Sequence, residues 1–196
     1  MRAGVLFSGG KDSTLAALLL DGFYDVTLVH AGFGVGEAAD HARETADAIG
    51  FAFDDATLDD AVAEEAVERM AEDGFPRNGI QTVHEAALEA VAGAGYDAVA
   101  DGTRRDDRVP TVSRARAQAL EERHGVDYLS PLAGFGRGAV DRLVDEQLEV
   151  EEGPAVELAK GDYEAELREL VREHGGDELA AEVFPDHVQT RVTGRR

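Results

Sequence analysis

The sequence predicts an α/β protein with a parallel sheet that is covered by helices on both faces. Short apolar runs alternate with longer amphipathic stretches over roughly the first 132 of its 196 residues, and this alternation is typical of parallel strands joined by crossover helices. Polar or glycine-rich loops follow three of the apolar runs, at residues 8–14, 31–36 and 101–108. Ligands bind at the carboxyl ends of the strands in such sheets, so these loops are the expected site.

We expect each element from its apolar spacing and from the glycines and prolines that end it. The expected strands are residues 5–7, 24–31, 51–53, 98–100 and 126–129. The expected helices are residues 13–20, 37–49, 58–72, 80–91, 113–123, 139–148 and 163–174, with a short helix that ends at Phe184-Pro185. We therefore divide the chain into residues 1–148, which hold the sheet, and residues 149–196, a small and mainly helical C-terminal extension with an acidic turn and a basic tail.

The loop after the first strand has the properties of a phosphate-binding turn. Gly9 and Gly10 allow the backbone to turn sharply and to bring its N–H groups close to a ligand. The helix that follows offers unpaired first-turn amides and the positive end of its dipole to an anion. The alternative is a Gly-Gly turn between strand and helix that binds nothing.

This loop differs from a Walker P-loop. Val5 stands where the Walker pattern needs glycine, and Asp12 stands where it needs serine or threonine. We expect Lys11 to neutralise phosphate oxygens and Asp12 to hold a Mg²⁺ ion that the phosphates share. Ser8 and Ser13 add hydroxyl donors.

The loop sequence resembles a known signature, that of the PP-loop (N-type) ATP pyrophosphatases, a branch of the adenine nucleotide alpha hydrolase-like fold. The matching residues are Ser8-Gly9-Gly10-Lys11-Asp12-Ser13. The resemblance covers roughly residues 3–132 and implies a three-layer Rossmann-like sheet with strand order 3-2-1-4-5. It also implies that ATP is cleaved between its α and β phosphates, so that a substrate oxygen is adenylated and pyrophosphate is released.

Two shorter motifs are similar to the same family. Residues 102–107, Gly-Thr-Arg-Arg-Asp-Asp, resemble its second motif, and Pro131-Leu132 resembles a pair that often follows the fifth strand. The alternative for Asp106 and Asp107 is a solvated acidic turn that pairs with its own arginines. The resemblance implies that the catalytic residues are Lys11, Asp12 and Asp107. Asp107 would either complete the Mg²⁺ site with Asp12 or orient the acceptor. The ATP-binding residues that it implies are Phe7, Ser8, Gly9, Gly10, Lys11, Asp12, Ser13, Thr14, His30, Gly102 and Thr103.

A second glycine-rich loop follows the second strand at Gly32, Gly34 and Gly36. A spaced glycine triplet is weak evidence by itself, so two interpretations stay open. The loop is either another phosphate-binding turn or a thin segment against which adenosine lies. His30 is placed among the ATP-binding residues because the end of the second strand is where adenine is expected.

The charge is strongly acidic, with one local exception. The formal net charge is −22, and lysine occurs only at positions 11 and 160; an acidic surface with little lysine is what a protein from a high-salt cytosol shows. The exception is a basic cluster of Arg104, Arg105, Arg108, Arg114 and Arg116. Its arginines are expected to bind phosphates of the substrate, with Arg104, Arg105, Arg108 and Arg114 as the substrate-binding set. The alternative is internal ion pairing.

Within this family, the short chain and the Gly-Thr-Arg-Arg-Asp-Asp stretch resemble small archaeal stand-alone PP-loop proteins related to tRNA thiolation enzymes. This resemblance makes a tRNA base the first candidate substrate. The chain has no cysteine, so sulfur would have to come from sulfide or a partner protein. An amide-forming ligase for a small carboxylate and a non-catalytic nucleotide-binding module are the alternatives. We expect a cytoplasmic protein without a membrane span; the oligomeric state stays open, with a dimer among the options.

Overall fold

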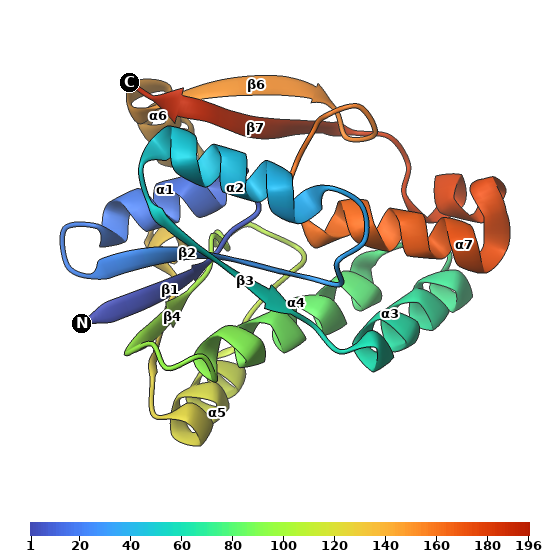
Figure 1. Cartoon of the computed structure of the whole chain (residues 1–196), viewed down its shortest axis with the longest axis horizontal. Coiled ribbons are helices and arrows are strands. Elements are labelled where there is room, and N and C mark those ends of the chain that lie inside the picture. The colour runs from blue at the N-terminus through green and yellow to red at the C-terminus, as the bar shows by residue number, and fades with distance from the viewer.

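A computed structural model describes all 196 residues and contains a five-stranded parallel sheet in the order β3-β2-β1-β4-β5 (Figure 1). This confirms the α/β Rossmann-like class and the predicted strand order. The strands are β1 Arg2–Leu6, β2 Asp25–Gly32, β3 Ala52–Thr57, β4 Ala98–Ala100, β5 Asp127–Leu129, β6 Leu148–Pro154 and β7 Val188–Arg195. The helices are α1 Lys11–Leu20, α2 Ala38–Ile49, α3 Asp60–Asp73, α4 Arg77–Ala92, α5 Arg114–His124, the 3₁₀ helix η1 Pro131–Gly134, α6 Arg137–Gln147 and α7 Tyr163–Val183.

Successive side chains of the sheet point to opposite faces, so it has two cores. Val5 of β1 packs with α1, α2 and α6 in one cluster of buried apolar residues. Leu6, the next residue, packs with α3, α4, α5 and α7 in the other. No helix is both long enough and apolar enough to cross a bilayer.

The structure corrects two sequence-based expectations. The third strand extends to Thr57, because β3 lies at the sheet edge and places Asp54 and Asp55 where water solvates them. The expected acidic turn and basic tail are instead strands, β6 and β7, which pair in an antiparallel sheet. Pairing between two segments that are separated by α7 created both strands. The alternation of β6 stops after Leu148-Glu149-Val150-Glu151, and β7 has only two apolar residues, Val188 and Val192, so the sequence signal for each strand is short.

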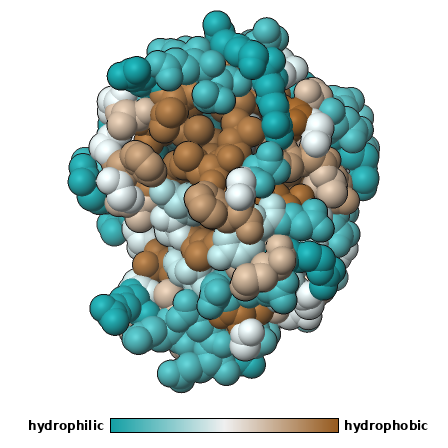
Figure 2. Space-filling view, turned by 90° about the vertical axis from the view of Figure 1, so that its left-hand side faces the viewer, coloured by the Kyte–Doolittle hydropathy of each residue, from teal (hydrophilic) through white to brown (hydrophobic).

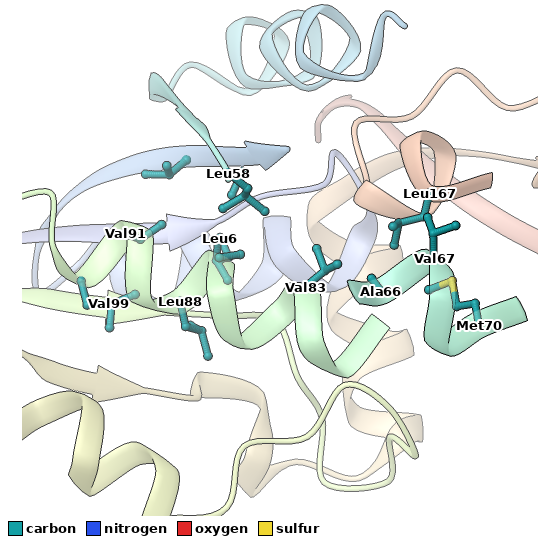
Figure 3. Close-up of a cluster of buried hydrophobic side chains, with 14 of the residues drawn as sticks. Leu6, Leu58, Ala66, Val67, Met70, Val83, Leu88, Val91, Val99 and Leu167 are labelled. Carbon is teal, nitrogen blue, oxygen red and sulfur yellow. The ribbon is translucent and has the colours of Figure 1, made fainter. Parts of the chain in front are cut away.

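The C-terminal residues also share the cores of the sheet domain. Leu167, Val171 and Val183 of α7 belong to the same apolar cluster as Leu6. Figure 3 shows Leu167 beside Val67 of α3. The boundary expected between residues 148 and 149 falls inside β6, so residues 149–196 are packed as part of one structural unit.

Truncation of Leu167 tests this shared core. Leu167 is fully buried, and Leu→Ala in a core typically costs about 2–5 kcal/mol of unfolding free energy. We expect Leu167→Ala to lower the stability of the whole chain in one urea transition, whereas Leu170→Ala, at a partly buried position, should cost less. Unchanged hydrogen exchange in β1 of the Leu167 variant would show that the C-terminal part folds separately.

Candidate functional site

A cleft lies at the carboxyl ends of β1, β2 and β4, where the strand order reverses between neighbouring strands. This is the position at which open parallel sheets bind ligands. Three groups of residues line it, from the loop after β1, from the loop after β4, and from the C-terminal segment. They include Phe7, Ser8, Asp12 and Ser13, then Asp101, Gly102, Thr103 and Asp107, and then Lys160, Gly161, Asp162, Tyr163, Glu164 and Gln189.

The loop after β1 is held in a fixed shape by its own hydroxyl groups. Gly9 has φ +72°, a conformation that glycine adopts without strain. The Ser13 hydroxyl donates to the Gly10 carbonyl oxygen over 3.2 Å, and the buried Thr14 hydroxyl donates to the same oxygen over 2.9 Å. Gly10 N–H donates to Ser8 Oγ over 3.3 Å. No side chain caps α1, so its first-turn amides are available to an anion in the cleft.

The loop after β4 approaches the start of α1 so closely that only glycine fits. A Cβ atom on Gly102 would lie 2.7 Å from Ser13 N and 2.8 Å from Asp12 C. These are backbone atoms, so a side chain could be accommodated only by moving the loop. The close contact brings the two predicted ATP-binding segments, around Ser13 and Thr103, into one cleft.

Asp12 and Asp107 face one guanidinium group. Arg104 Nη2 is 2.7 Å from Asp107 Oδ1, and Arg104 Nη1 is 3.6 Å from Asp12 Oδ2. Burial raises the pKa of Asp12 above its ordinary value of 3.8, although Arg104 and Lys11 act in the opposite direction. Its Oδ1 atom is buried without a hydrogen-bond partner, which leaves this oxygen available to a cation.

The predicted Mg²⁺ ion is compatible with these two carboxylates. Mg²⁺ is typically held by one or two carboxylates and completes its octahedron with phosphate oxygens and water. No cluster of three or more acidic, histidine or cysteine ligands is present. Asp12 and Asp107 would therefore hold an ion that substrate phosphates help to bind, and the ion would shield phosphate charge.

Two predicted ATP-binding side chains lie elsewhere. Lys11 points away from the cleft, and its Nζ atom is 3.3 Å from Asp141 Oδ1 of α6. His30 is 2% exposed and pairs through Nδ1 with Asp55 Oδ1 at 2.9 Å. Ala31, the next residue, lines the cleft. Because neighbouring residues of a strand face opposite sides, the His30 ring lies behind the sheet as seen from the cleft.

Backbone amides of the second glycine-rich loop bind the carboxylate of Glu166, a residue of this same chain. Glu166 of α7 is 2% exposed. Its carboxylate accepts hydrogen bonds from Phe33 N–H at 2.9 Å and from Val35 N–H at 2.9 Å. These amides are therefore not available to a phosphate, which leaves the interpretation of a thin loop beside the cleft.

A buried polar network in the cleft wall was not predicted from sequence. Asp101 accepts hydrogen bonds from the Thr103 backbone at 3.0 Å and the Tyr128 hydroxyl at 3.0 Å, and its Oδ2 is 3.0 Å from His84 Nε2. Burial alone would raise the pKa of Asp101, but hydrogen bonds from His84 and Thr103 hold the pKa below its usual value. His84 Nδ1 is 2.8 Å from the Tyr163 hydroxyl, so the ring bridges Asp101 and Tyr163.

This network holds the cleft wall in place, and its tyrosine hydroxyls do not act as general bases. Burial, followed by the nearby Asp101 carboxylate, raises the pKa of both Tyr128 and Tyr163, so both hydroxyls stay protonated at neutral pH. The one sequence signal for the network was the place of Asp101, directly between β4 and Gly102. Tyr163 and His84 come from α7 and α4, and nothing in the sequence pairs them.

The basic cluster divides into bound and free arginines. Arg104 pairs with Asp107, and Arg116 lies 3.1 Å from Glu89 and 3.4 Å from Glu85, so internal ion pairing is correct for these two. The other three members are exposed and make no ion pair: Arg105, Arg108 and Arg114. Of the C-terminal arginines, Arg191 pairs with Glu44 at 2.8 Å. Arg195 lies over the ring of Phe51, and Arg196 donates to the Leu148 carbonyl oxygen over 2.8 Å.

An apolar area lies on a different side of the molecule. Figure 2 faces the side on which β1 begins, and brown residues gather there within a polar surround. Met1 is 71% exposed and Phe23, in the turn between α1 and β2, is 80% exposed. Both residues lie at the amino ends of parallel strands, whereas the cleft lies at the carboxyl ends.

The fold and the cleft define a Rossmann-like α/β protein with a polar site at the reversal of strand order. The chain belongs to DUF7411, a family of unknown function whose model matches residues 1–194. It is similar to the uncharacterized protein MJ0690 of Methanocaldococcus jannaschii, at 42% identity over 195 residues, 99% of this chain and 96% of that protein.

A solved structure from M. jannaschii is also similar. That protein is described as a predicted subunit of tRNA methyltransferase, and the two share 41% identity with a TM-score of 0.90. The match covers 100% of this chain and 98% of the other. At this identity, coverage and TM-score the two proteins share the fold over their whole length.

The raised pKa of Asp12 predicts a stability effect that depends on pH. A carboxyl group with a raised folded-state pKa stabilises the fold fully below its ordinary value of 3.8, and this stabilisation is lost as pH rises through the raised pKa. Asp12→Asn cannot ionise, so we expect it to melt at a higher temperature than the native protein at neutral pH. The difference should shrink as pH falls towards 3.8.

Asp106→Asn is the matched control, because Asp106 is an exposed acid of the neighbouring loop. It should change the melting temperature little at either pH. A destabilised Asp12→Asn variant at neutral pH would mean that its ion pairs outweigh its burial.

Proposed function

We propose that the protein binds ATP in the cleft as a PP-loop enzyme and cleaves it between the α and β phosphates. A substrate oxygen attacks the α phosphorus, the bond to the bridging oxygen breaks, and pyrophosphate leaves with the electron pair. The observation that carries the proposal is the double-glycine turn, whose uncapped helix start lies beside Asp12 and Asp107. It combines anion-binding amides with carboxylates that suit a phosphate-bound Mg²⁺.

The roles of the cleft residues follow from their positions. Ser8 and Ser13, with the first-turn amides of α1, would bind phosphate oxygens, and Asp12 and Asp107 would hold Mg²⁺. Phe7 and Ala31 offer apolar contacts on the β1 and β2 side, where a base fits without charge. Thr103, fixed by Asp101 at 2.6 Å, would position the acceptor or the nucleotide.

We propose that the acceptor is a base of tRNA. The support is the trio of exposed arginines in and after the loop that carries Asp107, namely Arg105, Arg108 and Arg114, together with the description of the M. jannaschii neighbour as a predicted tRNA methyltransferase subunit. Guanidinium groups bind phosphates and position the nucleic acid without reading its sequence. Sulfide or an amine would then displace AMP from the adenylated base, and a partner protein is the source of sulfur if the product is a thiolated base.

An amide-forming ligase for a small carboxylate is the second candidate. The observation that favours it is the internal pairing of Arg104 and Arg116, which leaves a smaller basic surface than the sequence indicated. Such an enzyme would use the same ATP site and would need no bound RNA.

The cleavage site in ATP tests the first proposal. With ATP labelled in the α phosphate, Mg²⁺ and total tRNA, we expect label in AMP or an adenylate and unlabelled pyrophosphate. Asp12→Ala should reduce this turnover by roughly a hundred- to a thousandfold, the usual effect of losing one preorganised charge contact. Asp21→Ala, an exposed acid at the other end of α1, is the control. Label in ADP would contradict the family assignment.

Charge reversal at the free arginines tests the choice of acceptor. We expect the double variant Arg105→Glu with Arg114→Glu to abolish crosslinking to tRNA. The slope of the logarithm of the tRNA binding constant against the logarithm of the salt concentration should become shallower by about 2, one for each lost phosphate contact. ATP binding should be unchanged. The control is Arg69→Glu with Arg172→Glu, which alters the charge equally on α3 and α7. ATP turnover with a carboxylic acid but not with tRNA would favour the amide-forming ligase. Nucleotide binding without any turnover would favour the non-catalytic nucleotide-binding module.

A further inference from the structure

The two lysines of the chain lie on opposite sides of the double-glycine turn. Lys11 is part of the turn sequence, and Lys160 lies 149 positions later (160 − 11) in the segment between β6 and α7. Only Lys160 lines the cleft. The lysine in the loop sequence and the lysine in the cleft are therefore two different residues, and the chain has no other lysine.

Lys11 is directed towards α6. Its Nζ atom is 3.3 Å from Asp141 Oδ1, and its side chain lines a second hollow with Arg137, Asp145 and Arg196. The helix start therefore presents Asp12 and Ser13 to the cleft and turns Lys11 outward. This follows from helix geometry, since consecutive residues are separated by about 100° around the axis.

The backbone holds Lys160 over the turn. Gly161 N–H donates to the Ser8 carbonyl oxygen over 3.1 Å. A Cβ atom on Gly161 would be 2.6 Å from Ala38 O of α2, so the absence of a side chain lets the segment enter between α2 and the loop. The Gly161 amide follows Lys160 directly in the chain, so this hydrogen bond also places the Lys160 backbone beside the turn.

The Lys160 side chain is held by two partners and covers Gly10. Its Nζ atom is 2.8 Å from Asp162 Oδ2 and 3.4 Å from Gln189 Oε1. A Cβ atom on Gly10 would be 3.2 Å from Lys160 Cε and 3.5 Å from Nζ. The side chain is 14% exposed. An ammonium group has three donors, so one stays free after both contacts, and the group already lies beside the residue that opens α1.

We infer that Lys160, rather than Lys11, supplies the ammonium group that binds the phosphates of the nucleotide. The inference rests on the proposed function, because it assigns a residue to that same site. A phosphate at the start of α1 would meet the amides of the turn on one side and Lys160 on the other. Asp162 and Gln189 keep the ammonium group in place before the ligand arrives, and such preorganisation strengthens a charge contact in a partly buried site.

Covalent labelling tests the assignment directly in the native protein. An acyl-phosphate derivative of ATP transfers its acyl group to an amine near the phosphates: the lysine Nζ attacks the carbonyl, an amide forms and ATP leaves. The chain offers three amines, its N-terminus, Lys11 and Lys160, so mass spectrometry of the peptides identifies the target. We expect Lys160 to be labelled, and excess ATP with Mg²⁺ to prevent it.

Binding of ATP to lysine variants gives an independent readout. Lys160→Met keeps the apolar stem and removes the charge, and it should weaken ATP binding by roughly ten- to a hundredfold, as expected for one charge-assisted contact. Lys160→Arg should restore part of the affinity. Lys11→Met should weaken binding less than Lys160→Met does, and Arg69→Met, at an exposed site on α3, controls for the lost charge. Circular dichroism melting shows which variants remain folded.

The outcomes separate the two hypotheses. Labelling of Lys11, or a larger loss of affinity in Lys11→Met than in Lys160→Met, would overturn the assignment to Lys160 and leave the proposed function standing. A native protein that binds no ATP in the presence of Mg²⁺ would overturn both. Labelling of Lys160 that ATP competes away, with a selective loss of affinity in Lys160→Met, is the expected result.

Discussion

The cleft depends on two main-chain hydrogen bonds that hold the double-glycine turn from outside. Gly161 N–H donates to the Ser8 carbonyl oxygen over 3.1 Å, and Val192 N–H of β7 donates to the Gly9 carbonyl oxygen over 2.9 Å. Both donors come from the last quarter of the chain. A turn with two glycines has high conformational freedom, so its shape is set by these contacts as much as by its own hydroxyl groups. The C-terminal segment thereby forms one wall of the cleft.

A second constraint acts on the opposite wall. Asp101 collects hydrogen bonds from α4, from the loop after β4 and from β5, and His84 extends the network to Tyr163 at the start of α7. Buried polar groups are tolerated when all of them are paired. This network links four segments that are distant in sequence, and it keeps Gly102 in contact with the backbone of α1. The His84–Tyr163 hydrogen bond also ties this wall to the C-terminal wall.

The electrostatics of the molecule are local. A net charge of −22 repels polyanions at a distance, yet screening reduces the Debye length to about 3 Å at 1 M salt, so distant acids lose their effect while contact pairs persist. At the cleft, Arg104 lies between two carboxylates and Lys160 lies between Asp162 and Gln189. Each cation is held by a neighbour before any ligand binds. The acidic composition is thus compatible with a site for phosphate.

The sequence by itself determined the layered α/β fold and the strand–turn–helix at the double glycine, because apolar periodicity and adjacent glycines are local signals that survive in any tertiary context. Helices and most strands lie where that periodicity placed them, and Ser8, Asp12, Ser13, Gly102 and Asp107 do meet in one cleft. Only the tertiary structure decided the strands β6 and β7, the rotation of Lys11 and His30 away from the cleft, and the entry of Lys160 and Tyr163 into it. These depend on contacts between residues that are far apart in the chain, such as Gly161 with Ser8 and Val192 with Gly9. A pattern along the sequence carries no information about which distant side chain packs against the turn.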